Sequence, residues 1–326
     1  MSEILALAAQ NLISPVILSF VLGLAAAFMR SDLSFPEAIA KGLSLYLLFS
    51  IGFKGGAGVA LHGVDLGLGL ALLAGIVLSL VLPFLAFGLL RALATVSVID
   101  SAAVAAHYGS ISIVTFVAAS SLLANQGIAA EGYMVAVAAA MEAPAIISAL
   151  WLVAWRGGGA DRMGPQLWRE ILLNGSIVLL VGSFLIGWVT GADGLKEIEA
   201  FVVTPFKGVL CLFLLDMGLV AGRGLRSGRS VLSAGAVAFA LLMPPVGAAA
   251  GLLASLLLGL SYGGTVLLMV LSASASYIAV PAAMRVALPK ANPSLSLSLS
   301  LGITFPFNLT VGIPLYMAAA AVLVPA

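Results

Sequence analysis

The chain has 326 residues, of which 62% are hydrophobic and only 8% charged, and its mean hydropathy is +1.21. A charged fraction so far below the ~25% of an average soluble domain excludes a soluble globular protein, a nucleic-acid binder and a disordered chain. The net charge of +1 says nothing about partners, and a single cysteine allows no internal disulfide. The composition therefore indicates an integral membrane protein.

The apolar runs predict transmembrane helices, because they continue for ~20–30 residues where barrel strands alternate over ~10. Short polar, glycine and proline segments separate the runs, and the longest polar stretch, 156–162, lies near the middle of the chain. We predict ten helices, each long enough to cross the hydrocarbon core. In chain order they cover residues 9–29, 36–58, 66–90, 101–124, 132–155, 171–192, 201–222, 231–259, 263–288 and 294–324.

The loop charges predict the orientation. If ten spans alternate, only Lys196 falls in the loops of one side. The other side, which is cytoplasmic by the positive-inside rule, receives Arg30, Arg91, Arg156, Arg162, Arg169, Arg223, Arg226, Arg229, Arg285 and Lys290. We therefore expect both termini on the outer face, periplasmic for a multi-pass protein of a bacterial inner membrane.

Weak self-similarity separates two halves of the chain. Segment 48–56 resembles 214–222, and Ser110-Ile111-Ser112 resembles Ser274-Ala275-Ser276, both about half a chain apart. Three proline pairs follow the same order, namely Pro36 with Pro205, Pro83 with Pro244 and Pro144 with Pro306. Five spans per half would invert the second half, which is typical of secondary transporters with a midplane site. The predicted units are 1–158, a connecting loop at 159–170, and 171–326.

The two Ser-x-Ser pairs are the candidate binding site. Ser112 and Ser276 lie roughly 16–18 Å into their spans, from opposite faces of the membrane. Serines at i and i+2 share one site only if the helix is locally unwound, which lipid tolerates only around a cavity. Simple packing of small residues is the alternative. We predict that hydroxyls of Ser110, Ser112, Thr115, Ser274 and Ser276 line a site for a small anion.

Two carboxylates at mid-bilayer depth are the candidates for cation or proton coupling. A charge at this depth costs ~2.5–3.5 kcal/mol on insertion scales. Glu142 stands next to Pro144, and the matching region of the second half holds Thr304. Asp216 stands at the position that corresponds to Ser50. Pairing across helices is the structural alternative for both acids.

Other polar residues are expected to support the site. Lys54 either attracts an anion or snorkels towards water, and His107 is either a ligand or a hydrogen-bonded packing residue. Pro144, Pro281 and Pro306 are expected to break helices, and a free helix N-terminus favours a small oxyanion. The glycosylation pattern Asn308-Leu309-Thr310 lies inside a span and is discounted.

At these residues nearly the whole chain resembles the sodium-dependent bicarbonate transporter family. The resemblance is carried by Ser274-Ala275-Ser276-Tyr277-Ile278-Ala279-Val280-Pro281, by 289–294, by Gly302-Ile303-Thr304-Phe305-Pro306, by Ile51-Gly52-Phe53-Lys54-Gly55-Gly56 and by Gly109-Ser110-Ile111-Ser112. It implies ten helices in two inverted five-helix repeats, with core and gate domains, and a homotrimer. It also implies bicarbonate uptake coupled to sodium, and a cytoplasmic PII-like regulator in some members.

The chain departs from the cyanobacterial branch of that family at several positions. Tyr277 replaces an aspartate after the serines, and Asp216 stands where that branch has an apolar residue. Ile113 and Val114 replace Gly and Ser, and the loop between spans five and six is much shorter. These changes keep the scaffold but bear on the substrate and the coupling ion, and the short loop weakens the case for a PII-like partner.

The sequence therefore predicts a secondary active transporter that imports a small monovalent anion, bicarbonate first, together with sodium. No organic cofactor is expected. The alternatives are a proton- or sodium-coupled symporter of a carboxylate, a non-transporting sensor with the same fold, and a channel. A membrane enzyme is least expected, because no nucleophile–His–acid set or metal-ligand spacing occurs.

Overall fold

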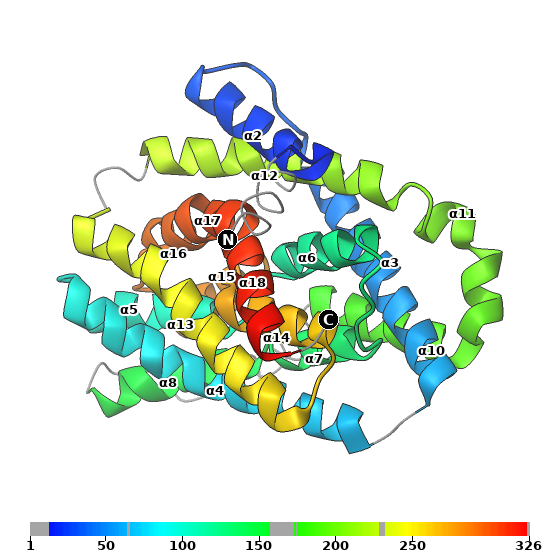
Figure 1. Cartoon of the computed structure of the whole chain (residues 1–326). Coiled ribbons are helices and arrows are strands. Elements are labelled where there is room, and N and C mark those ends of the chain that lie inside the picture. The colour runs from blue at the N-terminus through cyan, green and yellow to red at the C-terminus, as the bar shows by residue number, and fades with distance from the viewer. Residues whose placement is uncertain (1–12, 64–65, 157–172, 174, 228–231, 325–326) are drawn as a thin grey trace.

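The computed structural model describes residues 13–63, 66–156, 173, 175–227 and 232–324, and these contain helices but no strand (Figure 1). The helices of the first half are α2 (Pro15–Phe28), α3 (Glu37–His62), α4 (Leu66–Leu93), α5 (Val98–Gly109), α6 (Ile113–Asn125), α7 (Met134–Ala140) and α8 (Pro144–Trp155). Those of the second half are α10 (Gly175–Glu197), α11 (Glu199–Val202), α12 (Phe206–Ser227), α13 (Ala234–Leu258), α14 (Tyr262–Ala273), α15 (Ala279–Ala287), α16 (Pro293–Leu299), η2 (Ser300–Thr304), α17 (Phe305–Phe307), η3 (Asn308–Gly312) and α18 (Ile313–Leu323).

Eight helical segments among the described residues are long and apolar enough to cross a membrane. Two further apolar helices, Pro15–Phe28 and Tyr262–Ala273, are shorter and coincide with the first and ninth predicted spans. The prediction of an all-helical, multi-pass membrane protein is thus supported. The segment Val98–Asn125, which combines α5 and α6, contains a stretch of 18 residues that is completely buried and forms the centre of the molecule.

Serine side chains begin several of these helices. Ser97, Ser112, Ser233 and Ser261 each have extended backbone, and each accepts a hydrogen bond from an amide of the first helical turn. A short hydroxyl side chain satisfies an amide that would otherwise have no partner at a helix start. At the other end of α13, Gly259 adopts a left-handed conformation with φ of 64° that ends the helix.

Three predicted spans are interrupted inside the protein. Non-helical residues 110–112 separate α5 from α6, residues 141–143 separate α7 from α8, and residues 274–278 separate α14 from α15. The last span stays continuous but widens twice into π-helical turns, η2 and η3. The local unwinding predicted around both Ser-x-Ser pairs is therefore present. Of the three prolines expected to break helices, Pro144 begins α8, whereas Pro281 and Pro306 lie inside helical turns.

Two helix pairs at the edge of the molecule approach each other through glycines, α2 with α12 and α3 with α10 (Figure 1). A methyl group added at Gly23 would lie 2.0 Å from the Leu215 carbonyl oxygen, and one at Gly187 would lie 2.1 Å from that of Phe53. Only glycine allows backbones to pack this closely. Each pair joins one helix from the first half of the chain to one from the second.

We expect Gly56→Ala to destabilise the protein strongly, because the new methyl group would lie 1.9 Å from the Phe184 carbonyl oxygen of α10. Overpacking of this kind costs about 1–3 kcal/mol. Gly42 is a matched control in the same helix, since nothing lies within 4 Å of its added methyl group. Gly42→Ala should be neutral or stabilising by about 0.5–1 kcal/mol. Thermal unfolding in detergent compares the two, and equal melting temperatures would contradict the packing.

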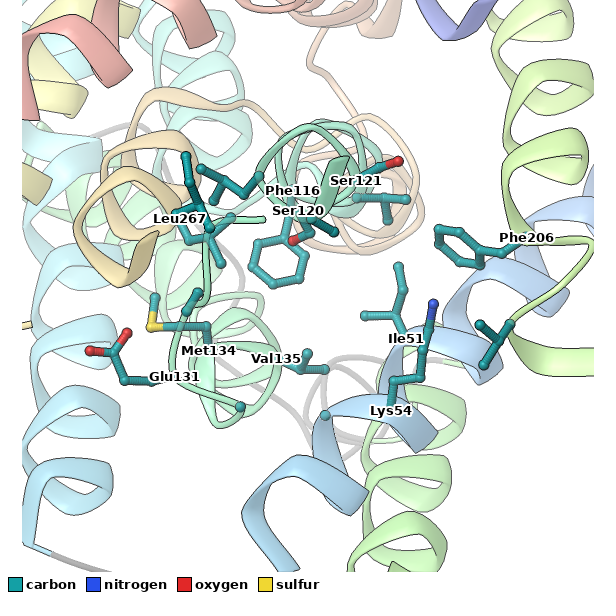
Figure 2. Close-up of a pocket in the computed structure, with 18 of the residues that line it drawn as sticks. Ile51, Lys54, Phe116, Ser120, Ser121, Glu131, Met134, Val135, Phe206 and Leu267 are labelled. Atoms are coloured by element: carbon teal, nitrogen blue, oxygen red, sulfur yellow. The ribbon is translucent and has the colours of Figure 1, made fainter. Parts of the chain in front are cut away.

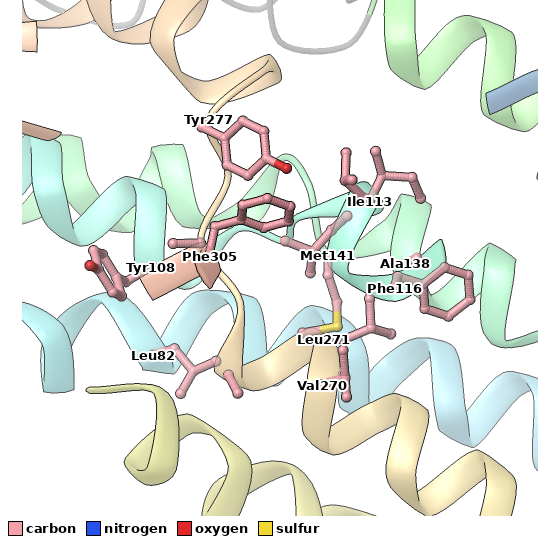
Figure 3. Close-up of a cluster of buried hydrophobic side chains, with 14 of the residues drawn as sticks. Leu82, Tyr108, Ile113, Phe116, Ala138, Met141, Val270, Leu271, Tyr277 and Phe305 are labelled. Atoms are coloured by element: carbon pink, nitrogen blue, oxygen red, sulfur yellow. The ribbon is translucent and has the colours of Figure 1, made fainter. Parts of the chain in front are cut away.

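Aromatic side chains fill the core around the interruptions (Figure 3). The Tyr277 and Phe305 rings are 5.3 Å apart, and the Phe305 ring also packs edge-on against Phe20 of α2, again at 5.3 Å. Tyr108 packs 4.7 Å from Phe239 of α13. These contacts connect the outer pair α2 and α12 to the interrupted helices.

Candidate functional site

The two interrupted Ser-x-Ser segments cross each other and are joined by three hydrogen bonds. The Ser112 amide donates to Ser274 Oγ at 2.8 Å, and the Ser276 amide donates to the His107 carbonyl at 2.7 Å. His107 Nδ1 lies 2.5 Å from the Ser276 carbonyl oxygen. A carbonyl can only accept, so Nδ1 carries the proton. We call this arrangement the crossing.

Some hydroxyl groups at the crossing donate hydrogen bonds within the protein, and others do not. Thr115 donates both its amide, at 3.2 Å, and its Oγ1, at 2.9 Å, to Ser112 Oγ. Ser274 Oγ donates to the Leu271 carbonyl at 2.9 Å. Ser112 Oγ accepts in both of these bonds, so its own proton is available to a ligand, with the neighbouring Tyr277 hydroxyl as the competing acceptor. The hydroxyl of Ser110 is buried and has no hydrogen-bond partner among the described residues.

Helix ends of both polarities meet at the crossing. α6 and α15 begin there, and α5 and α14 end there. Helix N-termini carry partial positive charge and favour anions, whereas C-termini carry partial negative charge and favour cations. The side-chain amide of Asn308 in η3 donates to the Ala273 carbonyl at 2.9 Å, which satisfies the last turn of α14. The crossing can therefore accommodate an anion and a cation close together.

The predicted anion ligands are all buried, with exposures of 4% or less. Hydrogen bonds connect Ser112, Thr115 and Ser274 directly, whereas Ser276 bonds to His107. Tyr277 is also buried beside Ser112, and its hydroxyl lacks a hydrogen-bond partner in the described part of the chain. Gly109 serves close packing, because a methyl group there would lie 2.2 Å from Pro83 of α4.

The predicted coupling residues lie in three separate environments. Glu142 lies in the interruption between α7 and α8, is 4% exposed, and its Oε2 has no described hydrogen-bond partner. Thr304 donates to the Ala240 carbonyl at 2.7 Å, so Tyr108, also at 2.7 Å, must donate to it. Asp216, in α12, has Arg223 as its charged neighbour. The three residues therefore belong to different surroundings rather than to one cluster.

Ser79 is a residue that sequence reasoning missed. It lies in α4, donates to the Met141 carbonyl at 2.6 Å and accepts from the Ala145 amide at 3.2 Å. One hydroxyl thus bridges the interruption that holds Glu142 and satisfies backbone groups on both sides of it. A single serine in an apolar run gives no signal of such a role.

Two cavities lie near the crossing, and His107 of the crossing lines only the smaller one. The larger, about 590 Å³, lies between α3 and α12 on one side and α6, α7 and α14 on the other, and Phe116, the neighbour of Thr115, lines it (Figure 2). The smaller, about 110 Å³, is lined by His107, Pro281, Met284 and Ser296. The smaller cavity therefore borders the crossing directly, and the larger one comes next to it at Phe116.

A comparison with known protein families shows to which family the chain belongs. The sequence model of the Na⁺-dependent bicarbonate transporter superfamily matches residues 15–321 of 326. The chain belongs to this superfamily. No curated protein matches the sequence. Membership and the apolar helices agree on a multi-pass membrane transporter, and the matched region contains every residue of the crossing and both cavities.

The described residues contain no group of three or more His, Cys, Asp or Glu side chains that could hold a metal ion. A cation site among these residues would therefore have to use hydroxyl and backbone oxygens beside fewer than three such side chains. Hard cations prefer oxygen ligands of this kind. The carbonyl groups at the ends of α5 and α14 and the unpartnered Glu142 oxygen are candidates.

Proposed function

We propose that this member of the superfamily is a secondary active transporter that imports bicarbonate together with sodium. The observation that carries the proposal is the crossing, where two interrupted helices meet and the free Ser112 hydroxyl stands at the start of α6. Hydroxyl donors and a helix N-terminus suit a small monovalent oxyanion. A cavity lined by His107 of the crossing, and a second cavity beside it at Phe116, are compatible with alternating access.

We propose that the chain crosses the membrane ten times as two inverted five-helix repeats, with both termini periplasmic. The glycine contacts support this topology, because Gly23, Gly52 and Gly56 of the first half recur as Gly187, Gly218 and Gly222 and make corresponding helix contacts. In this scheme α2, α3, α10 and α12 form a gate domain, and the interrupted helices belong to a core domain. A homotrimer remains our expectation for the assembly.

Coupling has a physical motive. Moving one negative charge inward against a negative interior costs ~2.3 kcal/mol per 100 mV, and a co-transported cation cancels that cost. We propose Glu142 as the first candidate for the coupling residue, because its buried carboxylate has no described partner for Oε2. Asp216 is second. The Thr304 oxygen would have to leave Tyr108 or Ala240 before it could bind a cation.

Uptake into liposomes tests the function. The purified protein is reconstituted, and labelled bicarbonate uptake is measured with an inward sodium gradient, with a proton gradient and with neither. We expect uptake that requires the sodium gradient. Uptake driven equally well without either gradient would contradict coupling. A preference for acetate or formate over bicarbonate would favour the carboxylate symporter.

We expect Asp216→Asn to weaken the sodium dependence, if this carboxylate binds the cation during the cycle. The side chain is 6% exposed, so an ion bound to it would be largely shielded from water. Loss of one ionic ligand should raise the sodium concentration for half-maximal uptake by about tenfold. Asp193→Asn, which changes an exposed residue of α10, is the control. An unchanged sodium dependence in Asp216→Asn would show that Asp216 does not bind the coupled cation.

A further inference from the structure

The larger cavity has a cationic lining that the crossing does not use. Lys54 from α3 and Lys207 from α12 both line it, together with Ser120 and Ser121 of α6 (Figure 2). By the proposed topology this cavity opens outward. Its affinity for an anion depends on whether other residues neutralise the two lysines.

Lys54 has no anionic partner. Its Nζ lies 3.8 Å from the centre of the Phe206 ring, and it makes no hydrogen bond or ion pair to a described residue. An aromatic face attracts an ammonium group but accepts few of its three N–H bonds. Figure 2 shows the nitrogen on the side of the cavity that faces Phe206, across from α6. The half-buried ammonium therefore keeps donors for a ligand in the cavity.

The carboxylate of Glu131 also lines this cavity and offsets one of the two lysine charges, because its hydrogen bonds go to the uncharged Ser261. Glu131 Oε1 accepts the Ser261 amide at 2.7 Å, and its Oε2 accepts the Ser261 hydroxyl at 3.0 Å. Glu131 thus stabilises the start of α14. Lys207 bonds to the neutral side-chain oxygen of Asn125, so this contact does not neutralise its charge. The lining therefore has a positive excess.

An unsatisfied hydroxyl lies in the wall of the same cavity, where its oxygen atom is covered. Ser121 is 8% exposed, and its Oγ has no hydrogen-bond partner among the described residues. A buried polar group without a partner is costly, and a bound ligand or water removes that cost. Ser121 comes from α6, opposite Lys54 and Phe206 (Figure 2). A ligand here would contact both sides of the cavity.

We propose that this cavity is a second anion-binding site, which holds a small monovalent oxyanion between Lys54, Lys207 and Ser121 before it reaches the crossing. The identity of the anion, bicarbonate, and its passage to the crossing rest on the proposed function, whereas anion binding in the cavity does not. The site raises the anion concentration next to Phe116, because focused positive charge in a low-dielectric cleft attracts anions. Its walls belong to different helix groups, so closure of the cavity would disperse the site and release the anion.

Thiol modification tests this site without transport. In a Cys211→Ala background, which lacks the single native cysteine, Ser120→Cys places a reporter thiol in the cavity lining. The rates of modification by anionic ethylsulfonate and cationic trimethylammonium-ethyl methanethiosulfonates are then compared. Thiolate reactivity cancels in their ratio, which reports the local potential. We expect Lys54→Met to lower the anionic-to-cationic ratio at least about tenfold, and bicarbonate to slow modification only when Lys54 is present.

Lys196→Met is the matched control, because Lys196 is exposed in α10 and does not line the cavity. It should leave the ratio unchanged. A ratio that Lys54→Met does not alter, or a reporter that bicarbonate does not protect, would overturn the proposal. If protection is seen but liposomes take up no bicarbonate, the anion site stands and the transport function fails. If uptake is normal but the ratio is unchanged, the transport function stands and the second anion site fails.

Discussion

Ser112→Ala is expected to raise the bicarbonate concentration for half-maximal uptake by about tenfold to a hundredfold. The Ser112 hydroxyl accepts two hydrogen bonds from Thr115, so its own proton is free for an anion. A hydrogen bond to a charged group is worth about 1.5–3 kcal/mol, which gives this range. The measurement is uptake into liposomes over a series of bicarbonate concentrations at saturating sodium.

Two companion variants separate binding from folding. Ser112→Thr keeps a hydroxyl at the start of α6 and should retain most of the affinity. Ser255→Ala removes a buried serine of α13 that donates to the Leu252 carbonyl, far from the crossing in sequence. It should affect melting temperature slightly and affinity not at all. If Ser112→Ala transports bicarbonate with the native affinity, the Ser112 hydroxyl does not contact the anion.

Glu142→Gln is expected to abolish sodium-driven accumulation. Gln keeps the size of the side chain but removes the charge that would attract a cation into a buried interruption. Without a cation, inward movement of a monovalent anion costs ~2.3 kcal/mol per 100 mV of membrane potential. This cost lowers the ratio of inside to outside bicarbonate at equilibrium about fifty-fold. Uptake should no longer respond to a sodium gradient, whereas bicarbonate exchange between equal concentrations should continue.

Glu131→Gln is the control for this prediction. Glu131 lies between α6 and α7, one connection before Glu142, and its carboxylate accepts hydrogen bonds from Ser261 at the start of α14. Its loss should lower the melting temperature and leave the sodium dependence intact. Concentrative uptake that persists in Glu142→Gln would assign coupling to another group, with Asp216 the next to test.

The crossing was the part of the site most open to prediction from sequence. Two Ser-x-Ser pairs half a chain apart can face one site only if both helices unwind, and both are interrupted at those residues. Hydrogen bonds between the two segments then follow from proximity, as between Ser112 and Ser274. The ten-span count, in contrast, is supported directly for eight segments, because α2 and α14 are short.

The remaining features depend on tertiary neighbours that a sequence does not reveal. The contact of Lys54 with Phe206 joins residues from α3 and α12, and no local pattern indicates it. Asn308 belongs to the glycosylation pattern that was discounted, and its side chain instead donates a hydrogen bond to the Ala273 carbonyl at the end of α14. The π-helical turns around Asn308 pack against α13 and α14, and no local pattern in the sequence predicts them.

The glycine contacts have a consequence for biosynthesis. α2 packs on α12, and α3 packs on α10. The second helix of each pair is synthesised much later than the first, so α2 and α3 cannot form these contacts when they are made. Until α10, which ends at Glu197, has left the ribosome, the surface of α3 around Gly52 and Gly56 must face lipid. A fragment that ends before α10 should therefore be a substrate for membrane quality control. Co-expression of the missing half as a separate chain should rescue the fragment, because α10 and α12 can then pack against α3 and α2.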